Sequence, residues 1–127
     1  MTIPAVIGYV LAGLIAAAII FLGARFLVAP RVAAAGYGVL ADVGQPGTRA
    51  YLAVKGIRDI ASGLLVIVVM IAGTTHLLGW IILAATIIPV GDATIVLSSG
   101  GAKSIACGVH GATAAVMLAT AALLLLS

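Results

Sequence analysis

Residues 64–92, LLVIVVMIAGTTHLLGWIILAATIIPVGD, show most clearly how this chain folds. Two strongly apolar runs flank the short connection Gly73-Thr74-Thr75-His76. A helix needs about 20 apolar residues to cross the hydrocarbon core of a bilayer, and each run supplies much of one crossing. Because the connection is so short, we expect the two helices to lie antiparallel to each other.

The composition of the whole chain indicates the same class of protein. Its 127 residues are 65% hydrophobic and 7% charged, and the mean hydropathy is +1.40. We therefore expect a single integral membrane domain over residues 1–127. A nucleic-acid partner is not expected, because no basic stripe with interleaved aromatic residues exists. The single cysteine, Cys107, excludes an internal disulfide.

The apolar segments predict an all-α fold, since backbone groups in lipid have to be satisfied within each segment. The short later turns predict an antiparallel bundle of four transmembrane helices. Pro4 suits the first turn of the first helix. Pro89 removes a backbone N–H from the third helix and is expected to disturb it. The expected helices are about residues 3–27, 50–72, 77–97 and 105–126, with one long connection at 28–49.

The basic residues that flank the apolar segments orient the bundle. They are Arg25, Arg31, Arg49 and Lys103. All of them lie in or beside the connections 28–49 and 98–104, whereas both termini and the 73–76 turn hold no lysine or arginine. Cytoplasmic loops carry an excess of basic residues. We therefore expect these two connections in the cytoplasm and both termini on the other side, in a multi-pass protein of the inner or plasma membrane.

A few charged or titratable residues lie inside the apolar segments. A charge at the bilayer centre costs about 2.5–3.5 kcal/mol on insertion scales, so it usually faces the bundle interior and often marks function. At a rise of 1.5 Å per residue, Arg58 lies about 12 Å, and Asp92 and His110 about 8 Å, from the cytoplasmic face. Three helices are thus predicted to bring polar side chains to one layer. Arg25, at the inner end of the first helix, can join them.

Four residues of this layer are the candidate catalytic residues: Arg58, Asp59, Asp92 and His110. We expect Arg58 to hold Asp92 in a bidentate pair, because its planar fork matches a carboxylate. Lys55 can reach Asp59 one helical turn away. The alternative for the Arg58–Asp92 pair is a structural ion pair that locks two helices together. His110 can equally be a proton-transfer group or a hydrogen-bonded core residue.

Three further residues are candidates for binding a substrate: Lys55, Tyr51 and Arg25. Tyr51 and Tyr37 can also be read as anchors at the membrane interface, where tyrosine is enriched. A zinc site would need a cluster of histidine or cysteine ligands that the sequence lacks. We therefore expect neither a metal site nor a cofactor.

Three stretches carry a resemblance to a known family: residues 54–63 (VKGIRDIASG), 88–92 (IPVGD) and 108–115 (GVHGATAA). Together they resemble an uncharacterised family of small four-helix membrane proteins, of the type named domain of unknown function 4267, near the DoxX-like group. The resemblance runs from about residue 36 to the C-terminus. It implies a four-helix fold and an Arg-Asp, Gly-Asp and His-Gly signature, but no settled activity. The signature falls on Arg58, Asp59, Asp92 and His110. The chain departs from the family pattern at Leu40, where a proline is common.

Two classes of function remain open. The first is an enzyme that acts on a small lipophilic molecule by acid/base chemistry, with one carboxyl group as proton donor and the other, oriented by Arg58, as base. Isomerisation, cyclisation or epoxide opening would need no cofactor. The second class is a proton-coupled transporter, or a lipophile-binding or accessory membrane subunit. The apolar outer halves of the helices argue against a continuous polar path.

The expected partners follow from the same features. They are the lipid bilayer, a small lipophilic ligand and a second copy of the chain. Small residues at four-residue spacing, such as Gly108 and Ala112, let helices approach closely and favour such self-association.

Overall fold

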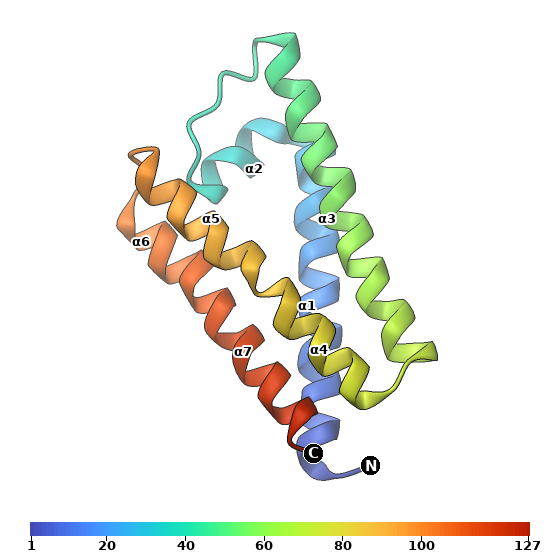
Figure 1. Cartoon of the computed structure of the whole chain (residues 1–127). Helices are drawn as coiled ribbons and strands as arrows, with labels where there is room; N and C mark the ends of the chain where they lie inside the picture. Colours follow the sequence, from blue (N-terminus) through green and yellow to red (C-terminus); the bar gives the residue numbers. More distant parts are fainter.

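The computed structural model describes all 127 residues and consists of helices and their connections, without a strand (Figure 1). The predicted all-α class is confirmed. The elements are α1 (Ile3–Val28), α2 (Pro30–Tyr37), α3 (Pro46–Ala72), α4 (Thr75–Ala85), α5 (Ile87–Ser98), α6 (Lys103–Ile105), the π-helix η1 (Ala106–Gly111) and α7 (Ala112–Leu125).

Two threonines explain where α1 and α4 begin. The Thr2 hydroxyl oxygen accepts a hydrogen bond of 3.3 Å from the backbone N–H of Ala5, and Thr74 accepts one of 3.1 Å from the N–H of Leu77. A helix start leaves four backbone N–H groups without an internal partner, and each threonine satisfies one of them. Pro4 lies in the first turn of α1, where a missing N–H costs no hydrogen bond.

Three helical stretches are long and apolar enough to cross a membrane: Ile3–Val28, Thr75–Ser98 and Lys103–Leu125. The protein therefore has the helices of a membrane protein, as expected. α3 is just as long, with 27 residues, but Lys55, Arg58 and Asp59 interrupt its apolar part. Composition alone thus identifies three crossings instead of the four that were predicted.

The predicted connection 28–49 differs from the structure, because α2 lies within it and α3 already begins at Pro46. Pro30 lies in the first turn of α2, and Gly38 ends this helix with a left-handed φ of 92°. Proline at a helix start and a left-handed glycine after its end are common boundary residues. The expectation of one long connection thus missed the eight-residue helix between them.

The third predicted helix is interrupted at Thr86, which separates α4 from α5. Pro89 has no N–H, so the carbonyl of Ala85 loses its usual partner one turn earlier. The Thr86 hydroxyl donates a hydrogen bond of 2.9 Å to the carbonyl of Ile82 at the same place. The expected disturbance by Pro89 is visible as this break.

The bundle is held by α1, which packs against both α3 and α7, and by α7, which also packs against α4. Leu78, Ile82 and Leu124 fill the core and are fully buried. Gly23 and Gly56 allow the backbones of α1 and α3 to touch: a Cβ atom on Gly56 would lie 2.5 Å from the carbonyl oxygen of Gly23. Such small residues let membrane helices approach closely.

α3 and α5 diverge from the turn that joins α3 to α4 (Figure 1). α2 lies at the wide end of this V, close to the upper end of α5 (Figure 1). Both termini lie at the opposite end of the molecule (Figure 1).

Candidate functional site

A hollow of about 270 Å³ lies between α2, α3 and α5. α3 supplies most of its wall, α2 supplies one tyrosine and α5 supplies two residues. The lining consists of Tyr37, Tyr51, Val54, Lys55, Arg58, Asp59, Ile88 and Asp92. Most of the residues that the sequence indicated therefore lie together. These are Tyr51, Lys55, Arg58, Asp59 and Asp92.

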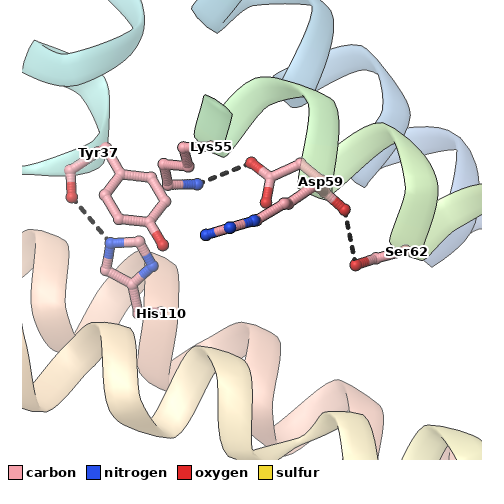
Figure 2. Close-up of polar contacts among 6 residues, drawn as sticks. Tyr37, Lys55, Asp59, Ser62 and His110 are labelled. Carbon is pink, nitrogen blue, oxygen red and sulfur yellow. Dashed lines mark hydrogen bonds and ion pairs between the residues drawn. The ribbon is translucent and has the colours of Figure 1, made fainter. Parts of the chain in front are cut away.

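Lys55 is the best-anchored charge of this hollow. Its Nζ lies 2.7 Å from Oδ2 of Asp59, which is the pair expected from their spacing on α3 (Figure 2). The same Nζ lies 4.2 Å from the ring centroid of Tyr37 and 4.5 Å from that of Phe26. A cation over an aromatic face is attracted by the electrons of the ring. Lys55 is thus held by one carboxylate and two aromatic rings.

The predicted pair between Arg58 and Asp92 is not formed. The one ion pair of the chain is that of Lys55 with Asp59. α3 and α5 diverge toward α2 (Figure 1), and Arg58 and Asp92 line the same hollow from these two helices without forming an ion pair. The guanidinium of Arg58 donates to no group of the protein; only its backbone carbonyl is engaged, by the hydroxyl of Ser62 at 2.9 Å (Figure 2).

Tyr37 is the site residue that the sequence did not single out. Its ring centroid lies 5.7 Å from that of Phe26 in an edge-on contact and 4.4 Å from that of His110. Figure 2 shows the ring between Lys55 and His110. The sequence signal was the Gly36-Tyr37-Gly38 stretch, which ends α2 directly after the tyrosine and so fixes where the ring lies.

The electrostatic surroundings of Tyr37 favour its neutral form. Burial raises the pKa of the Tyr37 hydroxyl well above its ordinary value, and the neighbouring Asp92 raises it further through hydrogen bonding and charge. The charge of Asp59 adds a smaller effect in the same direction. The phenol therefore keeps its proton at neutral pH and can act as a hydrogen-bond donor inside the hollow.

The end of α2 is held in place by the turn before α6. A Cβ atom on Gly101 would lie 2.7 Å from the carbonyl oxygen of Gly38, and one on Gly38 would lie 2.9 Å from a methyl group of Ile105. These two glycines allow backbone to pack on backbone. The position of Tyr37 is thus set by contacts with a part of the chain more than sixty residues later.

His110 lies behind Tyr37 and does not line the hollow. Its side chain is buried, and Nε2 lies 2.8 Å from the carbonyl oxygen of Tyr37 (Figure 2). Since a carbonyl oxygen only accepts, Nε2 carries the hydrogen. Of the two roles considered for His110, this contact favours the hydrogen-bonded core residue. Its element, η1, is a π-helix, a form that often occurs at functional sites.

Arg25 also lies outside the lining of the hollow. Its guanidinium carbon is 5.9 Å from the ring centroid of Phe21 on the same helix. No group of three or more histidine, cysteine, aspartate or glutamate side chains gathers anywhere in the chain in the way a metal ion would require.

A comparison with protein families gives one match. The model of the family described as Domain of unknown function (DUF4267) matches residues 16–124. The resemblance seen in the sequence is thereby confirmed, while the relation to the DoxX-like group stays a prediction. No curated protein and no solved structure matches the chain.

Proposed function

The chain belongs to the DUF4267 family, and we propose that it is a four-span membrane protein that binds a small lipophilic molecule and acts on it by acid/base chemistry. The site would be the hollow between α2, α3 and α5. The observation that carries this proposal is the charge pattern of the hollow. Lys55 is paired with Asp59, whereas Arg58 and Asp92 face the same space without pairing with each other.

The positions of the chain ends support a fourth crossing. Met1, Ser127 and Thr74 line a second hollow, of about 370 Å³, so both termini and the turn between α3 and α4 lie at one end of the molecule. α2 lies at the other end (Figure 1). If the three apolar stretches cross a bilayer, α3 has to cross it as well, because it connects the two ends. The basic residues near α2 support a cytoplasmic position for that end.

The lining of the hollow suits an amphiphilic ligand. Val54 and Ile88 contribute apolar surface beside the charged residues. Sites for small molecules are typically apolar, with a few polar groups that set the orientation of the ligand. A lipophilic molecule could enter between α3 and α5, which diverge on this side (Figure 1).

The proposed role of each side chain follows from whether it already has an ion-pair partner in the protein. Asp92 has no ion-pair partner, so it is the carboxylate available to take a proton from a ligand. The Tyr37 hydroxyl, beside Asp92, can return a proton, and Arg58 can stabilise negative charge that develops on the ligand. One proton taken and one returned balance an isomerisation or a cyclisation. Opening of an epoxide would consume one water molecule in addition.

A proton-coupled transporter is the alternative, and the packing of the bundle weighs against it. Away from the hollow the core is largely apolar, with Leu78, Ile82 and Leu124 fully buried. The hydroxyls of its buried threonines, Thr86 and Thr120, donate to backbone carbonyls one turn earlier. A proton path through a membrane needs polar groups along its length. The packing therefore supports a site open to one end more than a path through the bundle.

The test compares Asp92→Asn and Arg58→Ala with the wild type and with Arg49→Ala, a control at an exposed position of α3 outside the hollow. Lipophiles that co-purify with the wild type are identified by mass spectrometry and returned to each protein in lipid nanodiscs. We expect Asp92→Asn to slow conversion about 100-fold or more, the usual contribution of a general base, without loss of folding.

Three outcomes separate the candidates. Equal conversion by Asp92→Asn and the wild type would remove the role of Asp92 as base. A proton flux in liposomes that requires Asp92 would establish the transporter instead. Misfolding of both Asp92→Asn and Arg58→Ala would point to a purely structural role of these charges.

A further inference from the structure

We propose that the hollow selects amphiphiles with an anionic head group, a carboxylate or a phosphate, and that Arg58 binds this head. The chain of the ligand would leave the hollow along Val54 and Ile88. This inference rests on the proposed binding of a lipophilic molecule and adds the chemistry by which that molecule is recognised.

The first argument considers which partner the protein provides for each charged group that lines the hollow. Lys55 and Asp59 neutralise each other at 2.7 Å. Asp92 has the hydroxyl of Tyr37 as its neighbour. The guanidinium of Arg58 is the charged group for which the protein provides neither an ion pair nor a hydrogen-bond acceptor. The group that Arg58 lacks in this hollow is therefore a hydrogen-bond acceptor with a negative charge.

The second argument weighs the other head groups. A cationic head would meet two cations, Lys55 and Arg58; the carboxylate of Asp59 is already occupied, and Asp92 is the one carboxylate of the lining without an ion pair. A neutral lipophile would give the N–H donors of Arg58, an exposed side chain, no charged acceptor. A carboxylate or a phosphate accepts two of these donors at once, because its oxygens match the planar fork.

The third argument is size. The hollow has a volume of about 270 Å³, just below the range of about 300–1,000 Å³ of pockets that enclose a drug-sized ligand. It can hold a head group and the first carbon atoms of a chain. The remainder of a longer ligand has to lie outside, and Val54 and Ile88, each partly exposed, provide apolar surface for it.

The test measures by equilibrium dialysis how much of each of four amphiphiles binds to nanodiscs that contain the protein. Two of the amphiphiles are anionic (decanoate and decyl phosphate), one is neutral (decanol) and one is cationic (decyltrimethylammonium). The empty nanodiscs correct for partitioning into lipid. The proteins are the wild type, Arg58→Gln, Arg58→Lys and the control Arg49→Gln. Arg49 lies on the same helix, is exposed and does not line the hollow, and acetate and inorganic phosphate serve as competitors without a chain.

We expect the wild type and Arg49→Gln to bind the two anionic amphiphiles about tenfold or more tightly than decanol, the scale of a hydrogen bond to a charged group. Arg58→Gln should lose this preference. Arg58→Lys should keep part of it, because the charge remains without the fork. The comparison of decanoate with decyl phosphate identifies which head group is preferred.

Several results would overturn the inference. Equal binding of decanol and decanoate by the wild type would do so, while leaving the proposed acid/base function intact. Displacement of decanoate by acetate or inorganic phosphate at equal concentration would show a site for soluble anions. An anion preference that persists in Arg58→Gln would show that a group other than Arg58 binds the anionic head. If the preference depends on Arg58 but no ligand is converted, the inference stands and the proposed chemistry fails.

Discussion

Tyr37 owes its place at the centre of the site to neighbours from four different elements. Phe26 of α1, Lys55 of α3, Asp92 of α5 and His110 of η1 each face it. A tyrosine in a polar connection would normally be read as an anchor at the membrane interface. At the residue scale, the surroundings decide its chemistry, since the same phenol in water would have an unshifted pKa.

The first prediction concerns pH. Because the pKa of Tyr37 is raised in the folded protein above its ordinary 10.0, the unfolded chain loses this proton first as the pH rises. The contribution to stability is complete below about pH 10 and declines above it. We expect Tyr37→Phe to reduce the fall in melting temperature between about pH 9 and pH 11.5.

Absorbance provides an independent readout of the same group. While the protein stays folded, the wild type and Tyr37→Phe should develop the same amount of tyrosinate on titration to about pH 11.5, because Tyr37 keeps its proton. A clearly smaller signal in the variant would contradict the raised pKa.

The second prediction compares the two glycines on either side of Tyr37. Gly38 has a φ of 92°, and a Cβ atom there would meet Ile105 at 2.9 Å, whereas nothing lies within 4 Å of a Cβ atom on Gly36. Gly38→Ala should therefore cost about 2 kcal/mol or more from strain and overpacking. Gly36→Ala, inside helix α2, should be neutral or stabilising by up to about 1 kcal/mol.

Thermal unfolding in one detergent measures both variants. Both variants add the same methyl group near the end of α2, so a difference between them reflects the surroundings of Gly38 and not the glycine-to-alanine change itself. If the two alanines have the same effect on the melting temperature, the docking of α2 through Gly38 is refuted.

At the scale of elements, η1 and α2 act as one unit. η1 is a π-helix, whose i→i+5 hydrogen bonds span one residue more than the i→i+4 bonds of an α-helix. His110 in this turn reaches the carbonyl of Tyr37, the last residue of α2. The carbonyls at a helix end have no partner within the helix, and His110 satisfies one of them.

The third prediction tests this link. His110→Ala should destabilise the protein by about 1–3 kcal/mol, the cost of leaving the Tyr37 carbonyl without its partner. His76→Ala is the control, because His76 is exposed in the first turn of α4 and should change stability by no more than about 0.5 kcal/mol. His110→Gln, which retains an N–H donor, should recover part of the loss.

Thermal unfolding ranks these variants, and nitrogen NMR of the imidazole reports which ring atom carries hydrogen. We expect hydrogen on Nε2 of His110. A spectrum with hydrogen on Nδ1 alone, or equal melting temperatures for His110→Ala and His76→Ala, would disprove the link between η1 and α2.

At the scale of the whole molecule, the chain ends and the turn between α3 and α4 share one hollow, opposite to α2. Whether α3 crosses a membrane therefore has to be judged from the geometry of the bundle and not from the composition of α3 alone. α3 is excluded from the apolar set by its charges, but it still connects the two ends of the bundle. In the proposed fourth crossing, its charges would be tolerable because they line a hollow instead of facing lipid alone.

The fourth prediction tests the topology with single cysteines in a Cys107→Ala background. His76→Cys and Ser127→Cys should react with a membrane-impermeant maleimide from one side of sealed vesicles. Gln45→Cys and Ser99→Cys should react from the other side, since these residues lie at the opposite end of α3 and α5. Labelling of His76→Cys and Gln45→Cys from the same side would show that α3 does not cross.

Depth was predictable from the sequence, and partners were not. Counting 1.5 Å per residue along apolar helices predicts one layer for Arg58, Asp59, Asp92 and His110, and the first three do line one hollow, whereas His110 does not. The Lys55–Asp59 pair was predictable for the same reason, since both lie on one helix. The Arg58–Asp92 pair was not, because it depends on the angle between two helices.

The all-α class and the apolar helices thus follow from the sequence alone, since hydropathy and helix pitch are local properties. The entry of Tyr37 into the hollow and its contact with His110 arise from the tertiary packing. These two residues are 73 positions apart. Their contact depends on the close approach of Gly38 to the turn at Gly101, and packing between distant segments has no periodic signature in the sequence.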